Sequence, residues 1–166
     1  MSKGGKLNTK DLVDKIDKIT KERIAKEKVV SLADFRKLKE KTEPATILVI
    51  DDDESMRSAL QRIFESEGYK VILAADGTQL SHVLDDSTLD LIVLDIGLPW
   101  INGFELAKLM KENSDLKEIP LVFISGRTSE IDVKRGFELG ADDYIKKPFE
   151  IEDVKKSVKT LLKLNS

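Results

Sequence analysis

The sequence predicts an α/β fold in which one sheet of five parallel strands is covered by helices on both faces. Short runs of apolar, often β-branched residues alternate with stretches in which apolar residues recur every three or four positions. The runs at 46–50 and 91–94 are apolar throughout, as expected for strands that are buried on both faces. Alternation of such strands with helices favours a parallel sheet.

Each strand is expected to lead into a helix. The helix behind the first strand carries an apolar stripe from Met56 to Phe64 and stops at Gly68. Pro120 opens the fourth strand, and Gly140 closes the helix that follows it. Strands are predicted at 46–50, 71–74, 91–94, 121–124 and 144–146, and helices at 56–67, 78–84, 103–112, 129–139 and 151–162. Right-handed crossovers leave few strand orders, and we expect a doubly wound, flavodoxin-like (βα)5 sheet.

The composition is that of a folded protein, and it restricts the kinds of site that the chain can hold. Of the 166 residues, 40% are apolar and 36% are charged. No apolar run approaches the roughly 18 residues that span a bilayer, and the N-terminus lacks the apolar stretch of a signal peptide. We therefore expect a cytoplasmic protein without membrane contact. The chain has no cysteine and one histidine, so a bound metal would be held by oxygen atoms.

Residues 1–44 differ in character from the rest of the chain. They hold 13 Lys/Arg against 8 Asp/Glu, a net charge of +5, whereas residues 45–166 carry −8. We interpret 1–44 as a lysine-rich N-terminal extension and 45–166 as the folded domain. Two short amphipathic helices and a disordered leader are both open interpretations of the extension, because short isolated helices are marginally stable. Nucleic-acid binding is not expected, since the extension has no basic block and no aromatic interleaving.

Polar side chains follow four of the predicted strands. Asp51 and Asp52 come after the first strand, Asp95 after the third, Ser125 at the end of the fourth and Lys147 after the fifth. The carboxyl ends of parallel strands meet at one edge of the sheet, so these side chains are expected to converge. Carboxylates this close repel one another unless a cation neutralises them, and Mg2+ prefers oxygen ligands of this kind together with a phosphate. The pattern predicts a site for phosphoryl transfer.

Asp95 is the expected phosphoryl acceptor. It stands alone at the end of a central strand, and the backbone carbonyl of Gly97 in the following loop could serve the metal. Lys147 and the metal would neutralise the phosphoryl oxygens, which is most of what catalysis of such a transfer requires. Ser125 could donate a hydrogen bond to a phosphoryl oxygen.

Other interpretations compete with this one. Asp51 or Asp53 could simply be the N-cap of the helix that follows the first strand. An aspartate-nucleophile phosphatase of the haloacid-dehalogenase type would be phosphorylated on Asp51, but that hypothesis leaves the serine and the lysine at the strand ends without roles. A non-phosphorylated docking domain is a further alternative, and the complete set of acids and lysine argues against it.

Four segments resemble the receiver domain of two-component response regulators. They are 47–54 (ILVIDDDE), 91–99 (LIVLDIGLP), 123–126 (FISG) and 140–149 (GADDYIKKPF), in the order and at the spacing of that family. The resemblance covers about residues 45 to 164 and is closest to a single-domain regulator of the chemotaxis type, here with an N-terminal extension.

The resemblance implies a role for each residue of the predicted site. Asp52, Asp95 and the Gly97 carbonyl would bind Mg2+ directly, and Asp51 would act mainly through water. Asp95 would accept the phosphoryl group from a histidine kinase or a phosphotransfer protein. Lys147 would pair with the phosphorylated residue.

The family also has a conformational switch, which the resemblance places at Ser125, Tyr144 and Pro148. Phosphorylation would draw Ser125 inward and favour an inward Tyr144, as a shift between populations of one fold. The Lys147–Pro148 bond is expected to be cis. The sequence departs from the family twice, because Ser125 replaces a commoner threonine and Asn102 replaces a common aspartate. Neither change removes the chemistry.

The output of the switch is expected to be a protein contact. Only Asn165 and Ser166 follow the last predicted helix, so we expect no output domain behind it. A downstream protein target or a homodimer would then receive the signal. The chain would not be an enzyme on other substrates, since it would catalyse only its own phosphorylation and dephosphorylation.

Overall fold

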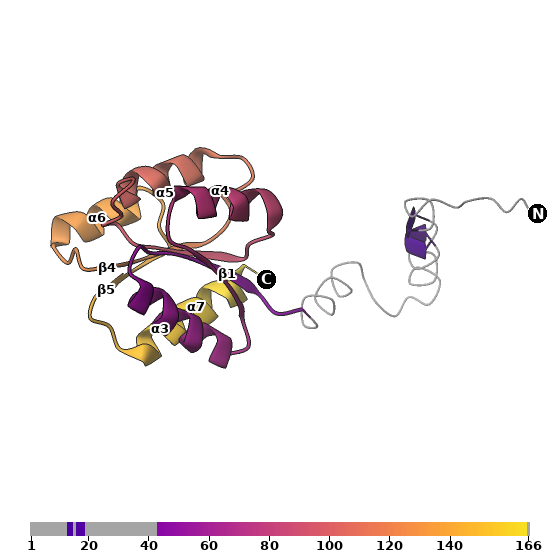
Figure 1. Ribbon diagram of the computed structural model, residues 1–166, viewed down its shortest axis with the longest axis horizontal. Helices are drawn as coiled ribbons and strands as arrows, with labels where there is room; N and C mark the ends of the chain where they lie inside the picture. Colours follow the sequence, from indigo (N-terminus) through magenta and orange to yellow (C-terminus); the bar gives the residue numbers. More distant parts are fainter. Residues whose placement is uncertain (1–12, 15, 19–42, 166) are drawn as a thin grey trace, which may run out of the picture. The chain divides into compact units, whose positions relative to one another are not determined.

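A computed structural model describes residues 13–14, 16–18 and 43–165 of the chain. Residues Pro44–Ser166 form a compact unit of their own (Figure 1). In the N-terminal extension, the described residues 13–14 and 16–18 are helical. The rest of our prediction for the extension lies outside the described residues.

The compact unit alternates strands and helices along its whole length (Figure 1). Its elements are β1 (Thr46–Ile50), α3 (Glu54–Ser66), β2 (Lys70–Ala74), α4 (Gly77–Asp86), β3 (Leu91–Leu94), α5 (Gly103–Glu112), β4 (Leu121–Ser125), α6 (Glu130–Glu138), β5 (Asp143–Lys146) and α7 (Ile151–Leu164). All strands pair in parallel, in the order β2-β1-β3-β4-β5. The predicted flavodoxin-like, doubly wound sheet is confirmed.

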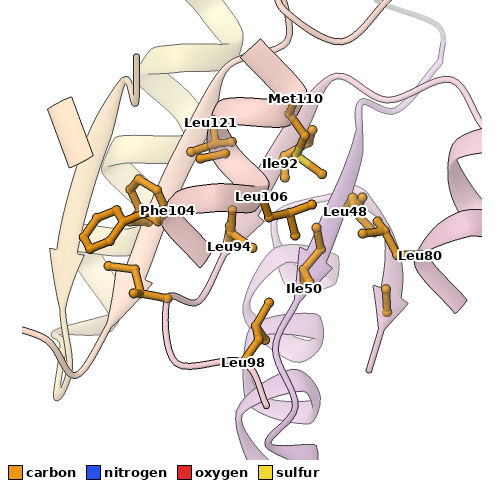
Figure 2. Packing of buried hydrophobic residues seen from close by; sticks show 14 of the residues in the cluster. Leu48, Ile50, Leu80, Ile92, Leu94, Leu98, Phe104, Leu106, Met110 and Leu121 are labelled. Carbon is orange, nitrogen blue, oxygen red and sulfur yellow. The ribbon is translucent and has the colours of Figure 1, made fainter. Parts of the chain in front are cut away.

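Helices cover both faces of the sheet. Figure 1 shows α4, α5 and α6 on one face and α3 and α7 on the other. On the first face, side chains from β1, β3 and β4 pack against α5, with Leu48, Leu94, Phe104 and Met110 among the residues seen in Figure 2. Every residue of β1, β3 and β4 is buried. Since each large apolar side chain contributes about 1.5 to 3 kcal/mol when fully buried, these central strands form a firm support for whatever lies at their ends.

The register of the sheet aligns the strand ends where the predicted site lies. Ile50 of β1 pairs with Leu94 of β3, so Asp51 and Asp95 leave neighbouring strands at the same level. At the other side of the sheet, Ser125 of β4 pairs with Lys146 of β5, and Lys147 follows at once. The alignment therefore brings residues that are far apart in the sequence to one edge.

Among the helices that the structure describes, none combines the length and the apolar character needed to cross a bilayer.

Candidate functional site

Three aspartates meet at the carboxyl ends of β1 and β3. Asp51, Asp52 and Asp95 each offer a carboxylate oxygen, and these oxygens all lie within 4.8 Å of one another. Asp51 is buried, Asp95 is half-buried and Asp52 is exposed. The arrangement is thus open to solvent on the Asp52 side and closed beneath Asp51. Such a group of carboxylates could hold a hard divalent cation.

Lys147 reaches this group from the end of β5. Its Nζ lies 2.8 Å from Oδ2 of Asp51 and 3.5 Å from Oδ2 of Asp95. The Lys147–Pro148 peptide bond is cis, as predicted. The one ammonium is therefore shared between two carboxylates of the cluster.

Burial and pairing shift the pKa values of this ion pair. Burial raises the pKa of Asp51 above its ordinary value, although the hydrogen bonds from Lys147 and from the backbone N–H of Asp53 oppose the rise. Burial alone would lower the pKa of Lys147, but the carboxylates of Asp51 and Asp95 outweigh it and raise that pKa above 10.5. Lys147 is therefore a firmly protonated cation beside the acids.

Asp53 has a structural task. Its Oδ1 accepts hydrogen bonds from the backbone N–H groups of Ser55 at 2.9 Å and Met56 at 3.3 Å, which makes it the N-cap of α3. The N-cap alternative is thus confirmed for Asp53 and wrong for Asp51. Arg57, in the first turns of the same helix, donates from Nη1 to the backbone carbonyl of Asp51 at 2.8 Å. This contact holds the loop that carries the first two acids.

The loop after Asp95 is packed against the first residue of α5, Gly103. The backbone N–H of Gly97 points to Oδ1 of Asp95 at 3.5 Å, and Gly97 is exposed. Gly103, the first residue of α5, packs directly on the backbone that follows β3: a Cβ there would lie 2.4 Å from the carbonyl oxygen of Asp95 and 2.4 Å from Cα of Ile96. Asn102 caps α5 by accepting from the backbone N–H of Phe104 at 2.8 Å. The departure at Asn102 thus leaves a working helix cap.

Ser125 and Tyr144 both hydrogen-bond to the backbone of one residue, Arg127. Ser125 is buried at the end of β4, and its Oγ accepts from the backbone N–H of Arg127 at 3.2 Å. The Tyr144 hydroxyl donates to the carbonyl of the same Arg127 at 2.5 Å. Tyr144 is only 8% exposed, so its ring lies inward. Burial raises the pKa of Tyr144, with the charge of Asp132 adding to the rise, so the hydroxyl stays a hydrogen-bond donor at neutral pH.

Every acidic and basic residue of this cluster was predictable from the sequence, but the residues that pack against the site or hydrogen-bond to its backbone were not. Arg57 and Gly103 carry no signal of their own, because an arginine in a helix and a glycine near a turn are common. Gly136 does carry one, since glycine is unfavourable inside a predicted helix, but that signal does not say what the glycine contacts. Gly136 lies in the middle of α6, where a Cβ would be 2.9 Å from Cδ2 of Tyr144. Only the placement of neighbours in space reveals these contacts.

A family model described as the response regulator receiver domain matches residues 47–159. The chain belongs to this family. The match includes all the residues of the site, from Asp51 to Pro148. Receiver domains work in two-component signalling, and the same holds for this one.

Two relatives illustrate the match. The chain is 39% identical over 116 residues to the aerobic respiration control protein ArcA of Escherichia coli, which covers 70% of the chain and 48% of ArcA. It is 38% identical over 117 residues to the transcriptional regulatory protein CpxR of the same species, covering 70% of the chain and 49% of CpxR. The receiver therefore spans about half the length of these relatives.

Solved structures show the same fold. The chemotaxis response regulator CheY4 of Vibrio cholerae superposes with a TM-score of 0.66 at 28% identity, covering 72% of this chain and 99% of CheY4. The receiver domain of the Francisella response regulator 1452 gives a TM-score of 0.68 at 28% identity, covering 74% and 99%.

Proposed function

We propose that this receiver is a phosphorylation switch in which Asp95 takes a phosphoryl group from a histidine kinase or a phosphotransfer protein, with Mg2+, and passes the change on by protein contact. One observation carries the proposal. Three carboxylates lie within 4.8 Å of one another, and the Lys147 ammonium stands 3.5 Å from one of them, Asp95. A cluster of acids with one cation is suited to binding a metal and a phosphoryl group together.

The donor set fits Mg2+. It would consist of carboxylate oxygens and the Gly97 carbonyl, with an exposed side at Asp52 where water can complete the coordination. Asp52, Asp95 and the Gly97 carbonyl would hold the ion, and Asp51, which is tied to Lys147, would act mainly through water. When bound, the ion supplies positive charge that neutralises the phosphoryl oxygens during transfer.

The transfer itself is a substitution at phosphorus. An oxygen of Asp95 forms the new P–O bond while the P–N bond of the donor phosphohistidine breaks, and the electron pair of that bond leaves with the imidazole. Asp95 thereby changes from one negative charge to about two. Lys147, already beside Asp95, would pair with the added charge. The protein's part is mainly positioning and electrostatic stabilisation, and not covalent catalysis on another substrate.

The response would begin at Ser125. When its hydroxyl turns to a phosphoryl oxygen, it gives up the hydrogen bond from the Arg127 N–H. The contacts of Arg127 then change, and the carbonyl of this residue accepts the hydrogen bond from the Tyr144 hydroxyl. The inward position of Tyr144 would then be favoured, as a shift between two populations. Pro148, directly after Lys147, belongs to the same proposed switch.

The partners are proposed from the same site. ArcA and CpxR are named for the control of respiration and of transcription, and their remaining halves lie outside the match. For this chain we propose a protein target or a homodimer as the recipient, without contact to nucleic acid. The cytoplasmic location and the division at residues 44 and 45 remain predictions from the sequence.

The phosphatase alternative has no observation in its favour. Asp51, which it would phosphorylate, is buried and bound to Lys147, whereas Asp95 is more accessible. The docking alternative is decided by whether Asp95 can be phosphorylated.

The test is the intact mass of the protein after incubation with acetyl phosphate and Mg2+, with a chelator as the parallel control. We expect one phosphoryl group on the wild type, none on Asp95→Asn and none without Mg2+. Asp115→Asn is the matched control, because Asp115 is an exposed aspartate in a loop. Labelling of Asp95→Asn would show that the acceptor is another residue. An unlabelled wild type, also with candidate kinases, would support the docking alternative.

A further inference from the structure

We propose that Gly136 is a positioning residue that permits the inward Tyr144, so that the absence of a side chain on α6 sets the balance between the inward and outward positions of this ring. The inference rests on the proposed function, because it assigns a determinant to the proposed switch. Its structural part concerns only where the Tyr144 ring lies and can be tested without phosphorylation.

Gly136 is a buried helix residue with no room for a side chain. A Cβ on Gly136 would lie 2.9 Å from Cδ2 and 3.2 Å from Cε2 of Tyr144, and 3.1 Å from Cδ2 of Phe123. Real Cβ atoms hardly ever come as close as 2.9 Å to another heavy atom. Since glycine inside a helix is destabilising relative to alanine, the interior of α6 is an unfavourable place for it. The close packing of the two aromatic rings against Gly136 explains why glycine occupies this position.

Of the two rings, Tyr144 is the one that can move. Phe123 is fully buried on β4 and packs edge-on against Phe104 of α5, with 5.5 Å between the ring centroids. Tyr144 stands on β5, which is the edge strand of the sheet. Its hydroxyl donates a hydrogen bond to the carbonyl of Arg127. A methyl group at position 136 would therefore be relieved most easily by rotation of Tyr144 away from α6.

The consequence is a link between α6 and the site. The inward ring bonds the Arg127 carbonyl, and the Arg127 N–H bonds Ser125. Crowding at Gly136 would break the first of these contacts and leave the second in place. A Gly136→Ala protein should therefore still bind Mg2+ and accept a phosphoryl group on Asp95 but respond to it weakly. Overpacking of the usual size changes the ratio of the two ring positions by about tenfold to a hundredfold.

The experiment follows the Tyr144 ring by NMR of isotope-labelled tyrosine, with a dissolved paramagnetic agent to measure exposure. The chain has two tyrosines, so a Tyr69→Phe background leaves Tyr144 as the single signal. We expect a shielded ring in the parent protein and an exposed ring in Gly136→Ala, before and after treatment with acetyl phosphate and Mg2+. A ring that stays shielded in Gly136→Ala overturns the inference.

A double variant controls for general damage to α6. In a Tyr144→Ala background the ring is absent, so Gly136→Ala should leave the melting temperature unchanged or raise it. If Gly136→Ala lowers the melting temperature as much in that background as in the parent, Phe123 is the source of the strain and the inference is wrong. It is also wrong if Gly136→Ala unfolds while the double variant folds, because the ring then cannot leave its place.

The intact-mass assay, combined with the NMR measurement, distinguishes phosphorylation of Asp95 from the positioning role of Gly136. If the parent is phosphorylated on Asp95 and the Tyr144 ring of Gly136→Ala stays as shielded as in the parent, the inference about Gly136 fails and the proposed function stands. If the parent is never phosphorylated but its ring moves outward in Gly136→Ala, the proposed function fails and the positioning role of Gly136 stands.

Discussion

Lys147 and Asp51 form a direct ion pair, with 2.8 Å between Nζ and Oδ2, although 96 residues separate them in the chain. The same ammonium lies 3.5 Å from Asp95. The lysine thus already neutralises part of the charge that a metal ion would neutralise. Lys147 and a bound cation therefore compete for the acids before phosphorylation and act together once a phosphoryl group adds negative charge.

The first prediction follows from this competition. Lys147→Met should bind Mg2+ more tightly by at least a factor of about ten, because at an effective dielectric constant of about 20 a unit charge about 5 Å away contributes about 3 kcal/mol of repulsion, and a tenfold change in affinity needs only about 1.4 kcal/mol. The variant should nevertheless be phosphorylated more slowly at saturating Mg2+, since the positive charge beside the phosphoryl oxygens is lost. Calorimetric titration with Mg2+ and the intact-mass assay measure the two effects. Lys146→Met is the control, as Lys146 is the exposed last residue of β5, next to Lys147 in the chain. Unchanged or weaker Mg2+ binding by Lys147→Met would contradict the competition.

A second prediction concerns acid pH. Because burial raises the pKa of Asp51 above 3.8, the folded protein binds this proton more tightly than the unfolded chain does. The stabilisation from the proton is complete below the unfolded pKa and is lost as pH rises through the raised folded pKa. In the presence of a chelator, the wild type should therefore lose stability relative to Asp51→Asn as pH rises from about 4, the ordinary aspartate pKa.

Mg2+ should reverse the sign of this difference, because the ion favours the ionised carboxylate. Denaturant unfolding of the wild type and Asp51→Asn at several pH values, with Mg2+ and with chelator, gives the comparison. Parallel pH profiles of the two proteins in chelator would mean that Asp51 keeps an ordinary pKa in the fold.

The charged residues of the site were predictable from the sequence, and the glycines that allow close packing around the site were not. Asp51, Asp95 and Lys147 stand directly after strands, and in a parallel sheet that position alone brings them to one edge. Gly103 and Gly136 matter because of what a Cβ would strike, namely the Asp95 backbone and the Tyr144 ring. Those distances depend on how α5 and α6 pack on the sheet, and no local pattern encodes them.

The same reasoning explains why the N-cap of α3 could not be assigned from the sequence to either Asp51 or Asp53. Asp51, Asp52 and Asp53 have the same side chain, and the turn into α3 decides which of them points to the site and which caps the helix. The structure gives Asp53 the N-cap, and the backbone N–H of Asp53 in turn bonds Oδ1 of Asp51 at 2.9 Å.

A third prediction separates these roles. Asp53→Ala should lower the free energy of unfolding by about 1 kcal/mol, the usual cost of losing an N-cap, with little change in Mg2+ affinity. Asp52→Ala should lower the Mg2+ affinity with little change in the free energy of unfolding, because Asp52 is exposed and its carboxylate faces the cluster. Denaturant unfolding and calorimetric Mg2+ titration of both variants provide the data. If Asp53→Ala were the variant that lost Mg2+ affinity, the assignment of ligands among the three acids would be wrong.

The fourth prediction concerns the packing of α5 on the phosphorylation site. A Cβ on Gly103 would meet two backbone atoms at 2.4 Å, the carbonyl oxygen of Asp95 and Cα of Ile96, and neither can swing aside as a side chain could. Gly103→Ala should therefore lower the free energy of unfolding by about 1 to 3 kcal/mol or more, the range for an overpacked core. It should also slow phosphorylation, since relief of the clash moves the backbone that carries Asp95.

Gly126→Ala is the matched control for stability, because a Cβ at Gly126 meets nothing within 4 Å. Denaturant unfolding of both variants, followed by the intact-mass assay on Gly103→Ala at a temperature where it stays folded, separates loss of stability from loss of alignment. Equal stability of the two variants would show that α5 can retreat from the sheet without cost. In that case the N-terminus of α5 would not hold Asp95 in place, and the geometry of the acceptor would depend on the central strands alone.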